Sequence, residues 1–290
     1  MMDVLIRPLT QADVKHTWEM SHHALHTAGL AYGWQMPALD DLGRQRGRER
    51  MTQYLTYDPD GAWVAEAEGE VVGIGAATRR GPLWYLSLLT VAPHAQAAGI
   101  GKRLLDATMQ TMGPAGALAA SDDPKALRRY RLAGFDLEPC YQAKGPLDRA
   151  LLPTVDGVRA GSYDDDRDFV EDIATHLRTT GHGPDLDFFA AIGRPLFVTE
   201  TPAGRGYLAR TEAGVAVLGA STPAAARALL WTALAESTAD EVLLMWLRPG
   251  QSWAIDVALE ARLALSPHGS FCARGAVGPM SPYIPNGAFG

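Results

Sequence analysis

The chain has 290 residues, enough for about two domains of ordinary size. A hydrophobic fraction of 47% suffices for buried cores, whereas no apolar run has the length of a membrane span and the first residues do not resemble a signal peptide. Two cysteines cannot form a disulfide framework and the net charge of −7 argues against nonspecific nucleic-acid binding, so we expect a cytoplasmic protein that binds neither membrane nor nucleic acid.

The first third of the chain predicts one strand, two helices and a hairpin. Thr10 and Asp13 form a capping pattern at the start of the first helix. The loop after that helix, from Gly29 to Pro37, carries Tyr, Trp and Met side chains that must cover something. Four arginines on the second helix indicate a solvated face with ion pairs. The expected ranges are 4–9 for the strand, 11–26 and 39–54 for the helices, and 63–68 with 70–77 for the hairpin.

The most specific signal follows the hairpin. Residues 83–91 are apolar, aromatic or β-branched apart from Ser87, which predicts a buried strand. Gln96, Gly99 and Gly101 then form the pattern Q-x-x-G-x-G, and apolar residues continue at helical spacing. A strand that runs through a glycine loop into a helix leaves backbone N–H groups unpaired at the positive end of the helix dipole. This arrangement predicts an anion site, most naturally for phosphate.

Seventeen consecutive residues, LTVAPHAQAAGIGKRLL from Leu89 to Leu105, resemble the acetyl-CoA-binding signature of the GNAT superfamily of N-acetyltransferases position by position. That signature is commonly L-x-V-x-P-x-x-[RQ]-x-x-G-[IV]-[GA]-x-x-L-[LM]. A Rossmann fingerprint and a P-loop fit worse, because G-x-G-x-x-G directly after the strand and G-K-[ST] are both missing. The plain alternative is a loop whose glycines only turn a corner. The resemblance implies acetyl-CoA as cosubstrate and an α/β fold.

The rest of the first half fits the same family order of elements. Gly116 to Ala120 predicts a strand, Asp123 and Pro124 open a helix, and Cys140 to Ala143 predicts a last strand. The order βααβββαβαβ is that of a GNAT domain, so residues 1–148 are expected to form one complete catalytic domain with a mixed, mostly antiparallel sheet flanked by helices. By resemblance, the loop after the first helix borders the acceptor site, although a loop packed on its own core fits as well.

Residues 149–290 resemble a degenerate repeat of the first half. A strand over 158–162, a hairpin over 197–200 and 206–209 and a strand over 215–220 recur in the same order. The next helix starts at Pro223 without a glycine loop, so no phosphate cradle is expected there. We therefore expect two tandem GNAT-like domains, the second degenerate, with an irregular tail from Phe271.

One alignment within this repeat concerns a catalytic position. Residues 254–262 line up with 126–134, which places Ala258 where the first half has Tyr130 and Arg262 where it has Gly134. The acidic run from Asp164 to Asp168 is interpreted as charge at a helix N-terminus rather than as a metal site.

The resemblance assigns the cofactor contacts. Backbone groups of Leu89, Thr90 and Val91 would bind the pantetheine arm and the acetyl oxygen. Backbone N–H groups of the loop and helix start would bind the pyrophosphate. These loop positions are Gln96, Ala97, Ala98, Gly99, Ile100, Gly101 and Lys102.

Two residues of the following helix complete the expected site. Tyr130, in the family pattern Y-x-x-x-G-F, is the candidate general acid that protonates the departing thiolate, with a core tyrosine as the alternative. Asp123 stands where the family commonly has Asn, which leaves its cofactor contact in doubt.

The sequence does not identify the general base. We name Glu66 on the hairpin as a catalytic candidate; Glu19, His22, His23, His26, His94 or a water molecule are the alternatives. His22 and His26 have a zinc-compatible spacing but no third ligand, so we expect no metal. Cys140 has no neighbouring base, which argues against a cysteine nucleophile.

The expected function is acetyl-CoA-dependent N-acetyl transfer to a primary amine by direct attack in a ternary complex. The acceptor is a small molecule or a peptide, and the protein is a monomer or a homodimer. A non-catalytic acyl-CoA sensor or scaffold is the alternative. The tandem order is also similar to that of mycothiol synthase, but there the intact site lies in the second half.

Overall fold

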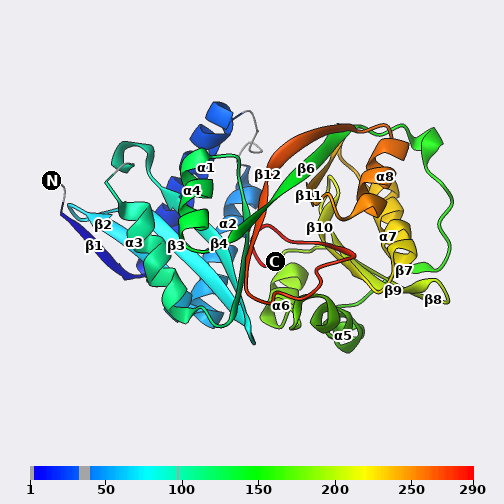
Figure 1. The fold of residues 1–290 in the computed structure, drawn as a ribbon, viewed down its shortest axis with the longest axis horizontal. Helices are drawn as coiled ribbons and strands as arrows, with labels where there is room; N and C mark the ends of the chain where they lie inside the picture. Colours follow the sequence, from blue (N-terminus) through cyan, green and yellow to red (C-terminus); the bar gives the residue numbers. More distant parts are fainter. Residues whose placement is uncertain (1–2, 33–39, 97) are drawn as a thin grey trace.

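The computed structural model describes residues 3–32, 40–96 and 98–290, whose arrangement is drawn in Figure 1. The helices are α1 (Val14–Tyr32), α2 (Asp41–Tyr57), α3 (Ile100–Thr108), α4 (Pro124–Leu132), α5 (Arg167–Arg178), α6 (Pro184–Ala191), α7 (Pro223–Ala235) and α8 (Ser252–Glu260). The strands are β1 (Val4–Pro8), β2 (Ala62–Ala67), β3 (Glu70–Arg80), β4 (Leu83–Val91), β5 (Ala115–Ala120), β6 (Asp136–Pro146), β7 (Val158–Ala160), β8 (Leu196–Thr201), β9 (Gly204–Arg210), β10 (Val215–Ala220), β11 (Glu241–Leu247), β12 (Ala264–Arg274) and β13 (Tyr283–Ile284).

These strands form two sheets within the described residues. The larger has eight strands in the order β1-β2-β3-β4-β5-β12-β6-β11, and the smaller has five in the order β13-β10-β9-β8-β7. All the strand pairs are antiparallel except β4 with β5. The α/β class and the mostly antiparallel sheets expected from the sequence are confirmed.

Helices cover both faces of the first part of the larger sheet. Alternation along β2 sends Val64 into a core shared with α1 and α2, and Ala65 into one shared with α3. On β3, Gly73 and Gly75 let α3 approach closely, since a Cβ on Gly75 would stand 2.9 Å from the Thr108 side chain. These two glycines therefore let α3 pack closely against the sheet.

The ends of the first two helices differ from the expectation. A 3-10 turn over Gln11–Asp13 precedes α1, and α1 continues to Tyr32, so Tyr32 is helical rather than part of a loop. The apolar and small residues after His26 support this extra helical stretch, because Ala and Leu are strong helix formers. Trp34 and Met36, the other large residues of the expected loop, lie outside the described residues.

The two halves of the chain share one sheet. Strand β12 lies between β5 and β6, pairing Cys272 with Leu118 on one side and with Leu137 on the other. Figure 1 shows β6 and β12 as long strands between the two halves. The first half is therefore not a complete domain as expected, because its own β5 and β6 are not neighbours; a boundary near residue 148 stays a prediction.

The tail also differs from the expectation. Phe271 belongs to β12, and β13 pairs with β10 through Tyr283 and Ile284. Phe289 is buried, with its ring 5.1 Å from that of Phe188. Residues 271–274 and 283–284 are therefore strand, whereas 275–282 and 285–290 contain no helix or strand, as expected.

A repeated ion pair supports the internal duplication. After β1, the guanidinium of Arg7 donates to Asp13 at 2.7 and 2.9 Å, and the backbone N–H of Thr10 donates to the same carboxylate. After β7, Arg159 donates to Asp166 at 3.0 and 2.5 Å. The N–H of Ser162 takes the place of that of Thr10. The acidic run in the second half thus serves helix entry.

The C-terminal ends of α4 and α8 repeat as well. Phe135 N donates to Tyr130 O at 3.1 Å, and Leu263 N donates to Ala258 O at 3.0 Å. These are the 6→1 bonds of a Schellman motif, which needs one residue in the left-handed region. The residues in that region are Gly134, with φ 88°, and Arg262, with φ 56°. The alignment of the two helices drawn from the sequence is thereby supported.

Candidate active site

The candidate site begins where β4 and β5 separate. Their parallel pairing is limited to three positions, ending at Tyr85 with Ala117, although β4 continues to Val91. Backbone groups on this edge of β4 are therefore free of β5 from Leu86 onward. A cavity of about 670 Å³ opens here, between the end of β4, the start of α3 and helix α4.

The start of α3 faces this cavity without a side-chain cap. Gly99 occupies the N-cap with φ 76°, a left-handed conformation that glycine adopts without strain. No side chain accepts a hydrogen bond from the first turn, and a Cβ on Gly99 would meet nothing within 4 Å among the described residues. The N–H groups and the positive end of the helix dipole are thus open to an anion, as a coenzyme A diphosphate requires.

Most residues assigned to cofactor binding line this one cavity. They are Leu89, Thr90, Val91, Gln96, Gly99, Ile100, Gly101, Lys102, Asp123 and Tyr130. Ala98 is not among the lining residues, and Ala97 lies outside the described residues. Gln96 turns its amide back to the chain, donating to Val91 O at 3.2 Å.

Asp123 has a clear structural role in addition to its place in the cavity. Its Oδ1 accepts from Lys125 N at 2.8 Å, which caps α4, and from the Tyr32 hydroxyl at 3.1 Å. The residue therefore joins the end of α1 to the start of α4. A direct cofactor contact of Asp123 stays a prediction.

Tyr130 lies on the buried side of α4, with 6% of its surface exposed. It packs with Trp84 and Phe135 and also lines the cavity. Burial, and to a smaller degree the proximity of Cys272, raises the pKa of the phenol well above its ordinary value. The phenol therefore keeps its proton at neutral pH, which suits a donor to a thiolate.

Glu66 does not lie with Tyr130. On β2, its carboxylate accepts from Arg7 Nε at 2.7 Å, and Arg7 in turn binds Asp13. Among the described residues, the cavity lining contains neither Glu66 nor Glu19, and none of the four candidate histidines. Helix α1 instead contributes Ala24, Leu25 and Ala28. The assignment of Glu66 as base therefore lacks the proximity it needs.

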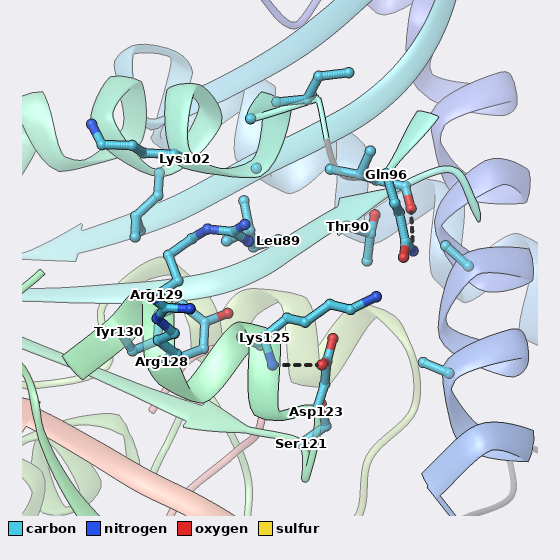
Figure 2. Close-up of a pocket in the computed structure, with 18 of the residues that line it drawn as sticks. Leu89, Thr90, Gln96, Lys102, Ser121, Asp123, Lys125, Arg128, Arg129 and Tyr130 are labelled. Carbon is cyan, nitrogen blue, oxygen red and sulfur yellow. Dashed lines mark hydrogen bonds between the residues drawn. The ribbon is translucent and has the colours of Figure 1, made fainter. Parts of the chain in front are cut away.

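The sequence analysis missed the basic face of α4. Lys125, Arg128 and Arg129 line the cavity and are spaced three and four residues apart, as neighbours on one helix face are. Figure 2 shows Arg129 reaching from α4 toward Leu89 and the start of α3. The sequence shows the spacing of these three residues, but it does not show that their side of α4 faces the cavity.

The equivalent position in the second half is closed. The Thr222 hydroxyl caps α7 by accepting from Ala225 N at 3.2 Å, and Pro223 in the first turn has no N–H to offer.

The described residues contain no group of three His, Cys, Asp or Glu side chains suited to a metal. No helix in the described part of the chain is long and apolar enough to cross a membrane.

Comparison with known proteins agrees with this geometry. Residues 30–135 match the acetyltransferase (GNAT) family. No curated protein matches the chain significantly. A candidate acetyltransferase from Pyrococcus horikoshii has a similar structure, with a TM-score of 0.76 at 18% identity, over 99% of this chain and 96% of that one.

Two further structures are similar over nearly the whole chain. A GCN5-related N-acetyltransferase from Sphaerobacter thermophilus gives a TM-score of 0.59 at 14% identity, over 94% of this chain and 95% of that one. A tandem GNAT protein from the clavulanic acid biosynthesis pathway gives 0.58 at 14% identity, over 94% and 99%. At such identities the likeness shows the fold. Residues 30–135 thus match the acetyltransferase (GNAT) family, and the whole chain has a fold similar to that of a tandem GNAT protein.

Proposed function

We propose that the protein is an acetyl-CoA-dependent N-acetyltransferase that acts on a primary amine by direct attack in a ternary complex. The observation that carries this proposal is the uncapped N-terminus of α3 at the edge of a cavity that also contains Tyr130. The open amides suit a diphosphate, and the Tyr130 hydroxyl offers a proton donor. The acceptor amine belongs to a small molecule or a peptide.

The residues of the chain would divide the work as follows. The N–H groups at the start of α3 bind the diphosphate, and the free edge of β4 from Leu89 to Val91 binds the pantetheine arm. A backbone N–H on that edge polarises the acetyl carbonyl. Donors aimed at developing negative charge are worth on the order of 3 kcal/mol each in other acyl transfers.

The transfer itself needs one bond formed and one broken. The amine nitrogen attacks the acetyl carbon, the carbon–sulfur bond breaks, and the electron pair leaves with sulfur. The Tyr130 hydroxyl gives its proton to that thiolate, and the surplus proton of the amine passes to water. Each product then leaves as a neutral amide or a neutral thiol, and solvent reprotonates the tyrosine.

A second candidate is a non-catalytic acyl-CoA sensor. The observation that favours it is the position of Glu66, whose carboxylate is held by Arg7 rather than facing the cavity. In such a protein the cavity binds the thioester without transferring its acyl group.

Thiol release from acetyl-CoA, measured across a panel of amines and peptides, separates the two candidates. We expect release with at least one acceptor. Tyr130→Phe should lower kcat by about 10²–10⁴-fold, with coenzyme A affinity nearly unchanged, because only proton donation is lost. Thermal stabilisation by acetyl-CoA without release for any acceptor would instead identify a sensor.

A further inference from the structure

Arg129 lies against the start of α3. Its side chain crosses the cavity from α4, as Figure 2 shows, and its Nη1 atom stands 2.6 Å from the position that a Cβ on Gly101 would take. With a Cβ at position 101, the guanidinium would have to shift from its present place. The cation therefore sits beside the amides of the open helix N-terminus.

This guanidinium is half-buried and makes no hydrogen bond or ion pair with the residues that the structure describes. Among the neighbouring bases, Arg131 pairs with Asp136 at 2.6 Å and Lys102 pairs with Asp106 at 2.5 Å. Lys125 and Arg128 are exposed to solvent, whereas Arg129 is half-buried. A partly buried cation without a counter-ion favours binding of an anion, because pairing offsets its lost hydration.

The acidic groups that line the cavity do not neutralise Arg129. Asp106 is paired with Lys102, and Asp123 accepts from Tyr32 and from the backbone of Lys125. The loop supplies no cation of its own at Gln96, whose amide donates to Val91 O. Within the described part of the cavity, Arg129 is thus a cation that lies against the start of α3 and has no carboxylate partner.

We propose that Arg129 binds the diphosphate of the coenzyme A thioester, completing from α4 the anion site that α3 opens with its backbone amides. This inference rests on the proposed function of the same cavity. A guanidinium suits the task, because its parallel N–H donors bind two phosphate oxygens at once, which an ammonium cannot do. The absence of a side chain at Gly101 thereby leaves the space that the Arg129 guanidinium occupies.

Calorimetry on the full chain with coenzyme A and with 3′-dephospho-coenzyme A tests the proposal. Arg129→Gln should weaken both ligands by about 10–100-fold, the range expected for charge-assisted hydrogen bonds. Arg129→Lys should fall between Gln and wild type. Arg131→Gln is the matched control on the same helix and should bind both ligands as wild type does. Melting curves of each variant confirm that it is folded.

A double-mutant cycle sharpens the test. Gly101→Ala places a methyl group 2.6 Å from Nη1 and so displaces the guanidinium; it should weaken coenzyme A in the wild-type background and far less in Arg129→Gln. Unchanged affinity in Arg129→Gln overturns the inference but leaves the proposed function standing. A loss confined to coenzyme A, absent with the dephospho form, also overturns it, since the contact would then be to the 3′-phosphate. Wild type that binds neither ligand refutes both proposals.

Discussion

Helices α3 and α7 follow the central strand in the two halves of the chain, and their first turns are built oppositely. At α3, glycine at the N-cap leaves the amides without a side-chain partner. At α7, Thr222 caps the helix and Pro223 removes one N–H altogether. The same strand–loop–helix unit therefore either offers its amides to a ligand or uses them for its own stability, and a few residues decide between the two.

What the second half has kept is as informative as what it has lost. The arginine–aspartate pair after the first strand and the 6→1 bond at the end of the later helix occur in both halves. Both features fix the local course of the backbone. The second half instead has a capped helix at α7 and Ala258 at the position aligned with Tyr130. The two halves thus share local structural contacts and differ at the positions that line the candidate site.

The largest expected effect comes from closing the open helix. Gly99→Glu together with Gly101→Glu should weaken coenzyme A by at least about 100-fold, because two carboxylates then occupy and charge the anion site. Calorimetry measures the loss. The matched control is Ala224→Glu, an exposed position in the first turn of α7, which should bind as wild type does. Equal loss in both variants would contradict a single binding site.

The repeated ion pairs should differ in strength. Arg7 lowers the pKa of Asp13 to about 2, from its ordinary 3.8, whereas the partner of Asp166 is 64% exposed against 25% for Arg7. Because the folded pKa is depressed, this stability is present above about pH 4 and is lost as the pH falls toward 2.

Asp13→Asn should therefore cost about 2 kcal/mol of unfolding free energy at pH 7, and Asp166→Asn about 1 kcal/mol or less. Urea denaturation over a pH series measures both. The difference between wild type and Asp13→Asn should vanish near pH 2. Equal costs at neutral pH would show that exposure does not set the strength of the pair.

The smallest effects concern the two Schellman turns. Arg262 holds a left-handed φ of 56° that strains any side chain with a Cβ, so Arg262→Gly should stabilise the protein by about 0.5–1 kcal/mol. Gly134→Ala should destabilise the protein by about 1 kcal/mol, because alanine is strained at the left-handed φ of 88°. The loss is no larger because the added Cβ would make only ordinary contacts, the nearest at 3.6 Å. Thermal unfolding measures both. Same-sign shifts would break the equivalence of the turns.

Local patterns predicted much of this molecule, and long-range pairing explains what they missed. The signature from Leu89 to Leu105 is contiguous, so strand, glycine loop and helix could be read together. The position of β12 could not, since it pairs with strands more than 100 residues away and no local feature marks the partner. Arg129 was missed for the same reason, because only the fold of the chain brings the end of its side chain to Gly101.

The position of Glu66 outside the cavity lining has a similar origin. Glu66 has a suitable side chain on a suitable hairpin, but the register of β1 with β2 sets it opposite Leu5, within reach of Arg7. Whether a carboxylate on a strand faces a cavity or an ion pair depends on that register and on the neighbouring strand. The sequence alone predicts the first turn of a helix more reliably than it predicts which residue of a neighbouring strand will lie opposite a given side chain.

Strand β12 also limits how this protein can be divided. A chain shortened to its first 148 residues would carry β5 and β6 with no strand between them, and each would expose a row of unsatisfied amides and carbonyls. The half that holds the candidate active site thus cannot be separated from its degenerate neighbour without opening its own sheet. The second half thus supplies, through β12, the strand that completes the sheet of the first half.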